Sequence, residues 1–197
     1  MTHTVVPQSE VYVFVSQVAS PVLLADMKSY LKVSNTIDDI LIQVMIDAST
    51  KWGEKYTGRD FRAITWNLLM DCFPANDRIL LKRDPVNTIT SVKHLVSDVE
   101  TTVPSTDYYL KKNTQNSEIL LFEDKSWPTD TDNREQAITV EFVTKAFNCG
   151  DNIESAIKRH VAHWYYNRGD CGDDCESAAQ LSGVKSIYGQ FRITRVC

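Results

Sequence analysis

The chain has no excess of basic residues: 21 Lys and Arg stand against 26 Asp and Glu, for a formal net charge of −5 at pH 7. Because phosphate contacts dominate the affinity of non-specific nucleic-acid binders, this balance disfavours broad binding of the DNA backbone. No apolar run approaches the roughly 20 residues that a helix needs to cross a bilayer, so we expect no membrane partner. Residues 1–4 lack the basic stretch of a secretory signal, which predicts the cytoplasm of the producing cell as the place of synthesis.

Regular cysteine spacing and catalytic signatures are also missing. The five cysteines are Cys72, Cys149, Cys171, Cys175 and Cys197. Their odd number and irregular spacing predict free thiols in a cytoplasmic chain instead of a disulfide framework. No dinucleotide-binding glycine motif, phosphate-binding loop, nucleophile elbow or His-Glu-x-x-His motif occurs. We therefore predict no catalytic residue and no cofactor. A hydrolase that uses scattered carboxylates is an alternative without a supporting motif.

Hydrophobic residues make up 43% and charged residues 24% of the chain, which is typical of a globular protein. Apolar spacing predicts three main helices, over residues 22–33, 36–57 and 152–167. For the second helix, Thr36 with Asp39 resembles a capping box, and Gly58 stands where a left-handed residue ends a helix. Its apolar residues recur at helical spacing and form one stripe: Ile37, Ile40, Leu41, Val44, Met45, Ala48, Trp52 and Tyr56.

Between the second and third helices the pattern changes to short β-rich runs separated by turn-forming stretches. We expect strands near residues 65–70, 79–81, 88–96, 108–110, 119–122 and 138–143. The predicted fold is therefore α+β, a small helical bundle with an antiparallel β unit inserted over residues 62–144. Residues 1–21 are expected to form an N-terminal arm with a short strand at 11–15. Residues 169–197 are expected to form an acidic loop and an extended C-terminal docking tail.

Several short sequence words between residues 22 and 168 resemble, in order and spacing, the head-to-tail connector (adaptor) family of tailed double-stranded-DNA phages. The matching words are Leu24–Val33, Asp38–Ile42, Trp52–Arg59, Thr65–Trp66, Asp71–Pro74, Pro85–Val92, Ser126–Pro128, Ile153–Ile157 and Val161–Arg168. No single word is specific, but together they span about three quarters of the chain.

The resemblance implies a structural virion protein at the head-tail junction, assembled in the host cytoplasm. Members of the family form a ring, usually twelvefold, beneath the portal vertex. They join the portal protein to tail components such as stopper or tail-terminator proteins. The ring leaves a channel through which genomic DNA passes without specific binding, and the family carries no catalytic residues. A ring subunit must offer two different surfaces, one for each neighbour.

Partner contacts are expected mainly in the tail, where apolar residues alternate beyond the last helix: Ile187, Tyr188, Phe191, Ile193 and Val196. Trp127 is a further contact candidate because it lies in a predicted loop, and aromatic residues are enriched at interface hot spots. Arg59 follows the helix stop and either binds the last carbonyls of the second helix or pairs with a carboxylate of a neighbouring subunit. Removing residues 185–197 is expected to abolish portal binding while the fold stays intact.

A different interpretation is a small zinc-stabilised protein. His160 and His163 are three residues apart on the third helix, and Cys171 and Cys175 follow in the acidic loop. Zinc prefers such nitrogen and sulfur ligands in a tetrahedral arrangement. Against this, His160 lies in the apolar stripe of its helix, where a hydrogen-bonded core histidine is the simpler interpretation. The acidic residues around both cysteines in the sequence are expected to raise the pKa of their thiols, which disfavours metal binding.

Overall fold

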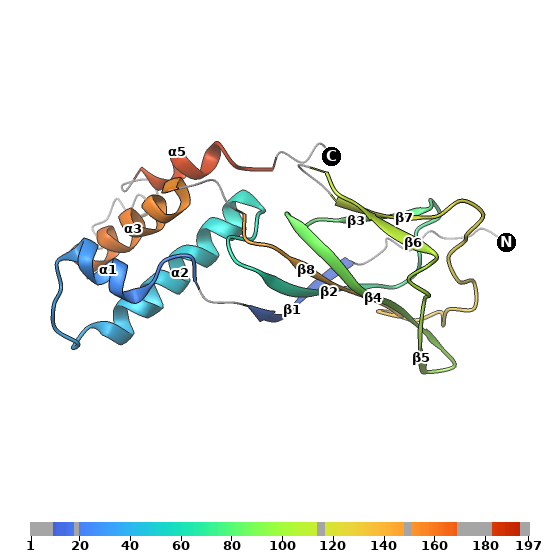
Figure 1. Cartoon of the computed structure of the whole chain (residues 1–197). Coiled ribbons are helices and arrows are strands. Elements are labelled where there is room, and N and C mark those ends of the chain that lie inside the picture. Colours follow the sequence, from blue (N-terminus) through green and yellow to red (C-terminus); the bar gives the residue numbers. More distant parts are fainter. Residues whose placement is uncertain (1–9, 18–19, 114–116, 148–150, 169–182, 194–197) are drawn as a thin grey trace, which may run out of the picture. The chain divides into compact units, whose positions relative to one another are not determined.

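A computed structural model describes residues 10–17, 20–113, 117–147, 151–168 and 183–193. Its helices and antiparallel sheets confirm the predicted α+β class. The chain divides into two compact units (Figure 1). The strand unit comprises residues 1–17 and 63–145, and the helical unit comprises residues 18–62 and 146–197. Each unit is therefore built from two separate segments of the chain.

The strand unit contains two antiparallel sheets. Its strands are β1 (Glu10–Gln17), β2 (Ile64–Met70), β3 (Arg78–Leu81), β4 (Val86–Val96), β5 (Val99–Thr102), β6 (Tyr108–Lys111), β7 (Ser117–Leu121) and β8 (Ile138–Thr144). The larger sheet has the order β1-β2-β8-β4-β5, and the smaller sheet has the order β3-β7-β6. Alternate residues of β2 and β8 are buried, and they share one apolar core with residues of the smaller sheet.

Most of these strands lie where the apolar runs predict them. The segment at residues 11–15 is a strand, as expected, and β1 pairs antiparallel with β2 at the edge of the larger sheet. Strand β5 is the exception, since it falls in a stretch that was expected to form turns. All of its residues are exposed, so no apolar alternation marks it in the sequence. It is held instead by its pairing with β4.

The helical unit consists of α1 (Leu24–Leu31), α2 (Asp39–Thr57), α3 (Asp151–Tyr166) and the short α5 (Val184–Gly189) among the described residues. Gly58 ends α2 with a φ of 73°, and its N–H donates to the Glu54 carbonyl, which confirms the predicted stop. The prediction of a capping box formed by Thr36 and Asp39 is wrong. Asp38 is the N-cap residue and makes no side-chain capping bond. None of the described helices is long and apolar enough to cross a membrane.

The stripe of apolar residues along α2 turns outward at its N-terminal end instead of into the core. Ile37, Ile40 and Val44 are 87%, 82% and 59% exposed. The opposite face is buried and combines two isoleucines with small and polar residues: Ile42, Ile46, Ser49, Thr50, Gly53, Glu54 and Thr57. Small residues let neighbouring elements approach closely. A Cβ atom added at Gly53 would lie 2.5 Å from Phe61 Cε2.

The C-terminal segment is helical where an extended tail was predicted. Val184–Gly189 forms α5, and Val184 and Tyr188 are fully buried in the core of the helical unit. The prediction of an extended tail from alternating apolar residues was therefore wrong for this segment. Val184 and Tyr188 are four residues apart, so they share one face of a helix.

Candidate functional site

Of the predicted tail contacts, the two most buried belong to the core of the chain itself. Tyr188 is 0% exposed and Ile193 is 7% exposed. Ile187 and Phe191 are half-buried and pack against the same core, so they retain some area for a partner. Val196 lies outside the described residues. The predicted role of Tyr188 and Ile193 as docking side chains is therefore replaced by a structural one.

Arg59 lies at the junction between α2 and the C-terminal segment. Its Nε donates a hydrogen bond of 2.9 Å to the Phe191 carbonyl, and its guanidinium lies 4.4 Å from the centre of the Phe147 ring. The Ile193 N–H donates to the Thr57 carbonyl at 2.9 Å. These contacts fix the residues after α5 to the end of α2. A pairing of Arg59 with a neighbouring subunit stays a prediction.

Trp127 belongs to the core of the strand unit instead of to an exposed contact loop. Its side chain is 7% exposed, and its ring stacks on Phe73 with centroids 4.9 Å apart and an interplanar angle of 4°. The predicted loop position had suggested an exposed contact residue and did not indicate this burial. Large aromatic rings are mostly buried on average, and that tendency is the better guide here.

The proposed zinc ligands are not brought together in the part of the chain that the structure describes. His160 is 1% exposed and its Nδ1 lies 3.1 Å from Ser49 Oγ, which confirms a hydrogen-bonded core histidine. His163 Nδ1 lies 3.3 Å from the Asn167 side-chain amide. Cys171 and Cys175 lie outside the described residues. Among the residues described, no group of three or more His, Cys, Asp or Glu side chains is arranged to hold a metal ion.

The environment of His160 predicts a pH-dependent stability of the helical unit. Burial, followed by the nearby His163, lowers the pKa of His160 from 6.5 to about 4. Because the unfolded chain then binds the proton more readily, stability is full above pH 6.5 and falls as the pH drops towards 4. We expect a loss of about 2 kcal/mol in the free energy of unfolding by pH 5. Urea unfolding at pH 7, 6 and 5 measures it.

The matched variants for this test are His160→Gln and His163→Gln. The first keeps a polar partner for Ser49 but cannot be protonated, so its free energy of unfolding should change less between pH 7 and 5. The second alters a half-exposed histidine and should retain most of the dependence, because burial is the larger cause of the lowered pKa of His160. Burial raises the pKa of Glu54, which acts in the opposite direction, so the difference between wild type and His160→Gln is the quantity to compare. An equal pH dependence in both proteins would contradict the role of His160.

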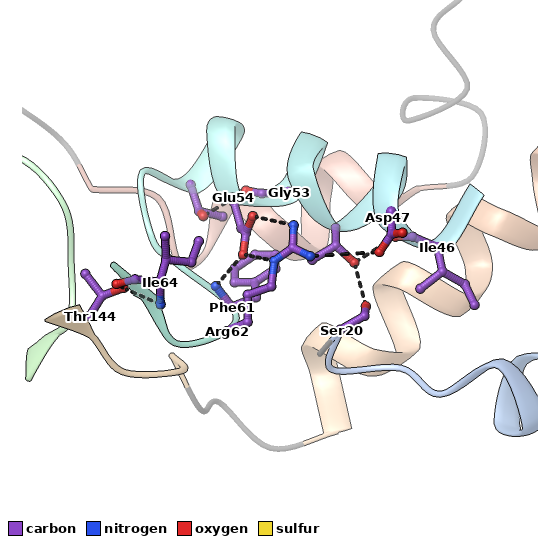
Figure 2. Close-up of polar contacts among 11 residues, drawn as sticks. Ser20, Ile46, Asp47, Gly53, Glu54, Phe61, Arg62, Ile64 and Thr144 are labelled. Atoms are coloured by element: carbon purple, nitrogen blue, oxygen red, sulfur yellow. Dashed lines mark hydrogen bonds and ion pairs between the residues drawn. The ribbon is translucent and has the colours of Figure 1, made fainter. Parts of the chain in front are cut away.

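A buried ion pair lies at the base of α2 (Figure 2). The Glu54 carboxylate accepts bonds from Arg62 Nε at 3.2 Å, from Arg62 Nη2 at 3.3 Å and from the Phe61 N–H at 3.0 Å. Asp47 lies 3.8 Å from the same guanidinium. Both Glu54 and Arg62 are buried, and burial raises the pKa of Glu54 although the guanidinium opposes this. The pair fixes the turn that leads from α2 towards the strand unit, and it has the features of a structural contact.

The two most exposed large hydrophobic side chains among the described residues, Ile37 and Ile40, belong to the outward face of α2. This α2 outward face consists of Ile37, which precedes the helix, and of Ile40, Val44, Ala48, Lys51 and Lys55, all of them exposed. It is apolar over its first half and basic over its second. The sequence contained a signal for this orientation: Ser49, Thr50 and Gly53 fall together on the opposite side of the helix and allow close packing there.

No protein-family model matches the chain, and no curated protein matches its sequence. Solved structures do match its fold. A chain in the neck of an empty GTA particle, computed with C6 symmetry, superposes with a TM-score of 0.76 and 17% identity, over 95% of this chain and 97% of that chain. A chain in the neck of a native GTA particle, computed with C12 symmetry, gives a TM-score of 0.74 and 18% identity over 95% and 97%.

A chain in the virion of a native gene transfer agent (GTA) particle gives a TM-score of 0.72 and 18% identity, over 94% of this chain and 97% of that chain. In all three comparisons the similarity extends over almost the whole of both chains, strand unit and helical unit included. The chain therefore has the fold of these GTA neck and virion chains.

Proposed function

We propose that the protein is a structural, non-catalytic subunit of a virion neck. In this role it forms a ring-shaped head-to-tail connector between the portal protein and the tail components at the head-tail junction. The ring leaves a channel through which DNA passes. Stopper or tail-terminator proteins are the partners on the tail side, and the copy number we propose is twelve.

The observation that carries this proposal is the shared fold with chains of particle necks, over 95% of this chain at TM-scores of 0.76 and 0.74. Those necks were computed with C6 and C12 symmetry, which is the symmetry of a ring. The sequence words that resemble the connector family support it from independent data. A net charge of −5 also suits a subunit that lets DNA pass without holding its phosphates.

The test is the mass of the purified protein by light scattering, alone and mixed with its cognate portal protein, with electron microscopy of any large species. We expect closed rings, or a monomer that joins portal rings in a fixed stoichiometry. A protein that stays monomeric and does not bind the portal protein under any condition would contradict the proposed function.

A further inference from the structure

The α2 outward face has the physical character of half an interface. A helix normally turns its apolar stripe to the core and its polar side to water. Here Ile37, Ile40 and Val44 are mostly exposed, while the buried side carries serine, threonine, glycine and glutamate besides two isoleucines. Burying such aliphatic side chains stabilises an assembly in proportion to the apolar area removed from water, so three neighbouring exposed ones are typical of a contact surface.

The α3 outward face, on the other side of the helical pair, has a complementary pattern. It consists of the exposed residues Asp151, Glu154, Ser155, Arg159 and Tyr166. The first two carry negative charge at the beginning of the helix. Arg159 lies in the middle of the face. The Glu154 carboxylate forms an ion pair of 3.5 Å with Lys158 of the same helix. Tyr166, 67% exposed, supplies a large ring at the end of the helix.

Helices α2 and α3 run antiparallel within the helical unit. The beginning of α2 is therefore level with the end of α3, and the end of α2 is level with the beginning of α3. Asp38, at the beginning of α2, accepts a bond of 2.7 Å from the hydroxyl of Tyr165 near the end of α3. Ser49, in the second half of α2, meets His160 one turn earlier on α3. Along the helix axes, the aliphatic end of α2 is therefore level with Tyr166, and its basic end is level with the acidic beginning of α3.

Subunits of a closed ring meet through two different surfaces, and adjacent copies stand at the same height along the ring axis. Each outward face is opposite the buried side of its helix, so the two faces point away from each other. When the two helices lie along the ring axis and one copy places α2 against α3 of the next, positions that are level within one subunit meet across the contact. Lys55 is then opposite Asp151 and Glu154, as electrostatic complementarity requires, and Lys51 lies one turn earlier on α2.

We propose that the α2 outward face of one subunit packs against the α3 outward face of a second copy of this chain, and that this contact closes the ring. The inference rests on the proposed function, because it names the surface through which the proposed ring forms. It also accounts for the apolar character of a helix face that the isolated subunit leaves in water.

The first test replaces aliphatic residues on the face. The double variant Ile40→Glu/Val44→Glu places two charges in the proposed contact, and we expect the concentration for half-assembly to rise by about 100-fold or more. The matched control is Val99→Glu, on the exposed strand β5 of the strand unit, which should assemble like wild type. Assembly is measured by light scattering and electron microscopy, alone and with portal protein, and circular dichroism checks the fold of each variant.

The second test exchanges charges and identifies the opposing surface. Lys51→Glu/Lys55→Glu and Asp151→Lys/Glu154→Lys should each weaken assembly, because each places like charges across every contact of the ring. The quadruple variant that combines them restores opposite charges at every contact and should assemble more strongly than either double variant. A quadruple variant no better than the double variants would overturn the assignment of α3 as the opposing surface.

Failure of this inference differs from failure of the proposed function. If wild type forms rings and Ile40→Glu/Val44→Glu forms them equally well, the α2 outward face is not the contact between subunits. The proposed function as a ring subunit is then still supported. If wild type forms no ring with or without portal protein, the proposed function is rejected and the inference with it. Rings in wild type and Val99→Glu, together with loss in the face variant, support both.

Discussion

Tyr188→Ala is expected to remove about 3–5 kcal/mol from the free energy of unfolding, because it deletes a fully buried aromatic ring. The ring packs against Phe61 with centroids 5.5 Å apart and against Trp52 at 5.8 Å, and it lies beside Gly53 on the buried face of α2. A loss of this size is a large share of the roughly 5–15 kcal/mol that stabilises an ordinary domain. Urea unfolding followed by tryptophan fluorescence measures it, with Trp52 as a local reporter.

The controls are Tyr188→Phe, which keeps the ring, and Tyr30→Ala, which removes a tyrosine that is 50% exposed. Both should cost far less than Tyr188→Ala. The same argument revises the expected effect of removing residues 185–197. That deletion takes away most of α5 and should destabilise the helical unit, so lost portal binding in the shortened protein would not identify a docking tail. A deletion with unchanged stability would contradict the packing described for α5.

Glu54→Ala is expected to cost about 3–5 kcal/mol, because it leaves the Arg62 guanidinium buried without its bidentate partner. The Phe61 N–H loses its acceptor as well. The double variant Glu54→Leu/Arg62→Leu removes both charges and should lose much less than the single variant, since matched apolar replacement of a buried pair is often tolerated. Chemical denaturation of the three proteins gives the comparison.

An exposed ion pair provides the control for this prediction. Lys93 Nζ lies 2.8 Å from Glu100 Oε2, with side chains 34% and 55% exposed. Glu100→Ala should leave the unfolding midpoint almost unchanged, since exposed pairs contribute little. If Glu54→Ala were as mild as Glu100→Ala, the buried pair would not stabilise the turn after α2.

Local patterns in the sequence were enough to predict the α+β class, the three main helices and most strands. Gly58 is an example, because a helix stop depends only on neighbouring residues and a backbone conformation that glycine adopts readily. His160 is another, since its place in an apolar stripe indicated a core histidine. Such features are decided within a few residues of the chain.

Orientation towards a core was harder to predict, because it depends on segments that are distant in the sequence. The apolar stripe of α2 predicted burial of Ile40 and Val44, but close packing through Ser49 and Gly53 turned the opposite side inward. The tail was misassigned for the same reason: Tyr188 completes a core that begins more than a hundred residues earlier. Trp127 shows a third case, where a loop residue is buried by a ring contact with Phe73.

The division of each unit into separate chain segments sets the order in which the residues of each unit are synthesised. The strand unit has all of its residues once position 145 has left the ribosome. The helical unit lacks part of its core until α5 is made, because Tyr188 of α5 packs against Gly53 of α2 and against Phe61. Before α5 is synthesised, the growing chain therefore has all residues of the strand unit but lacks part of the helical core. The helical core is complete only after α5 emerges, so a surface that depends on this packing is not yet formed before that point.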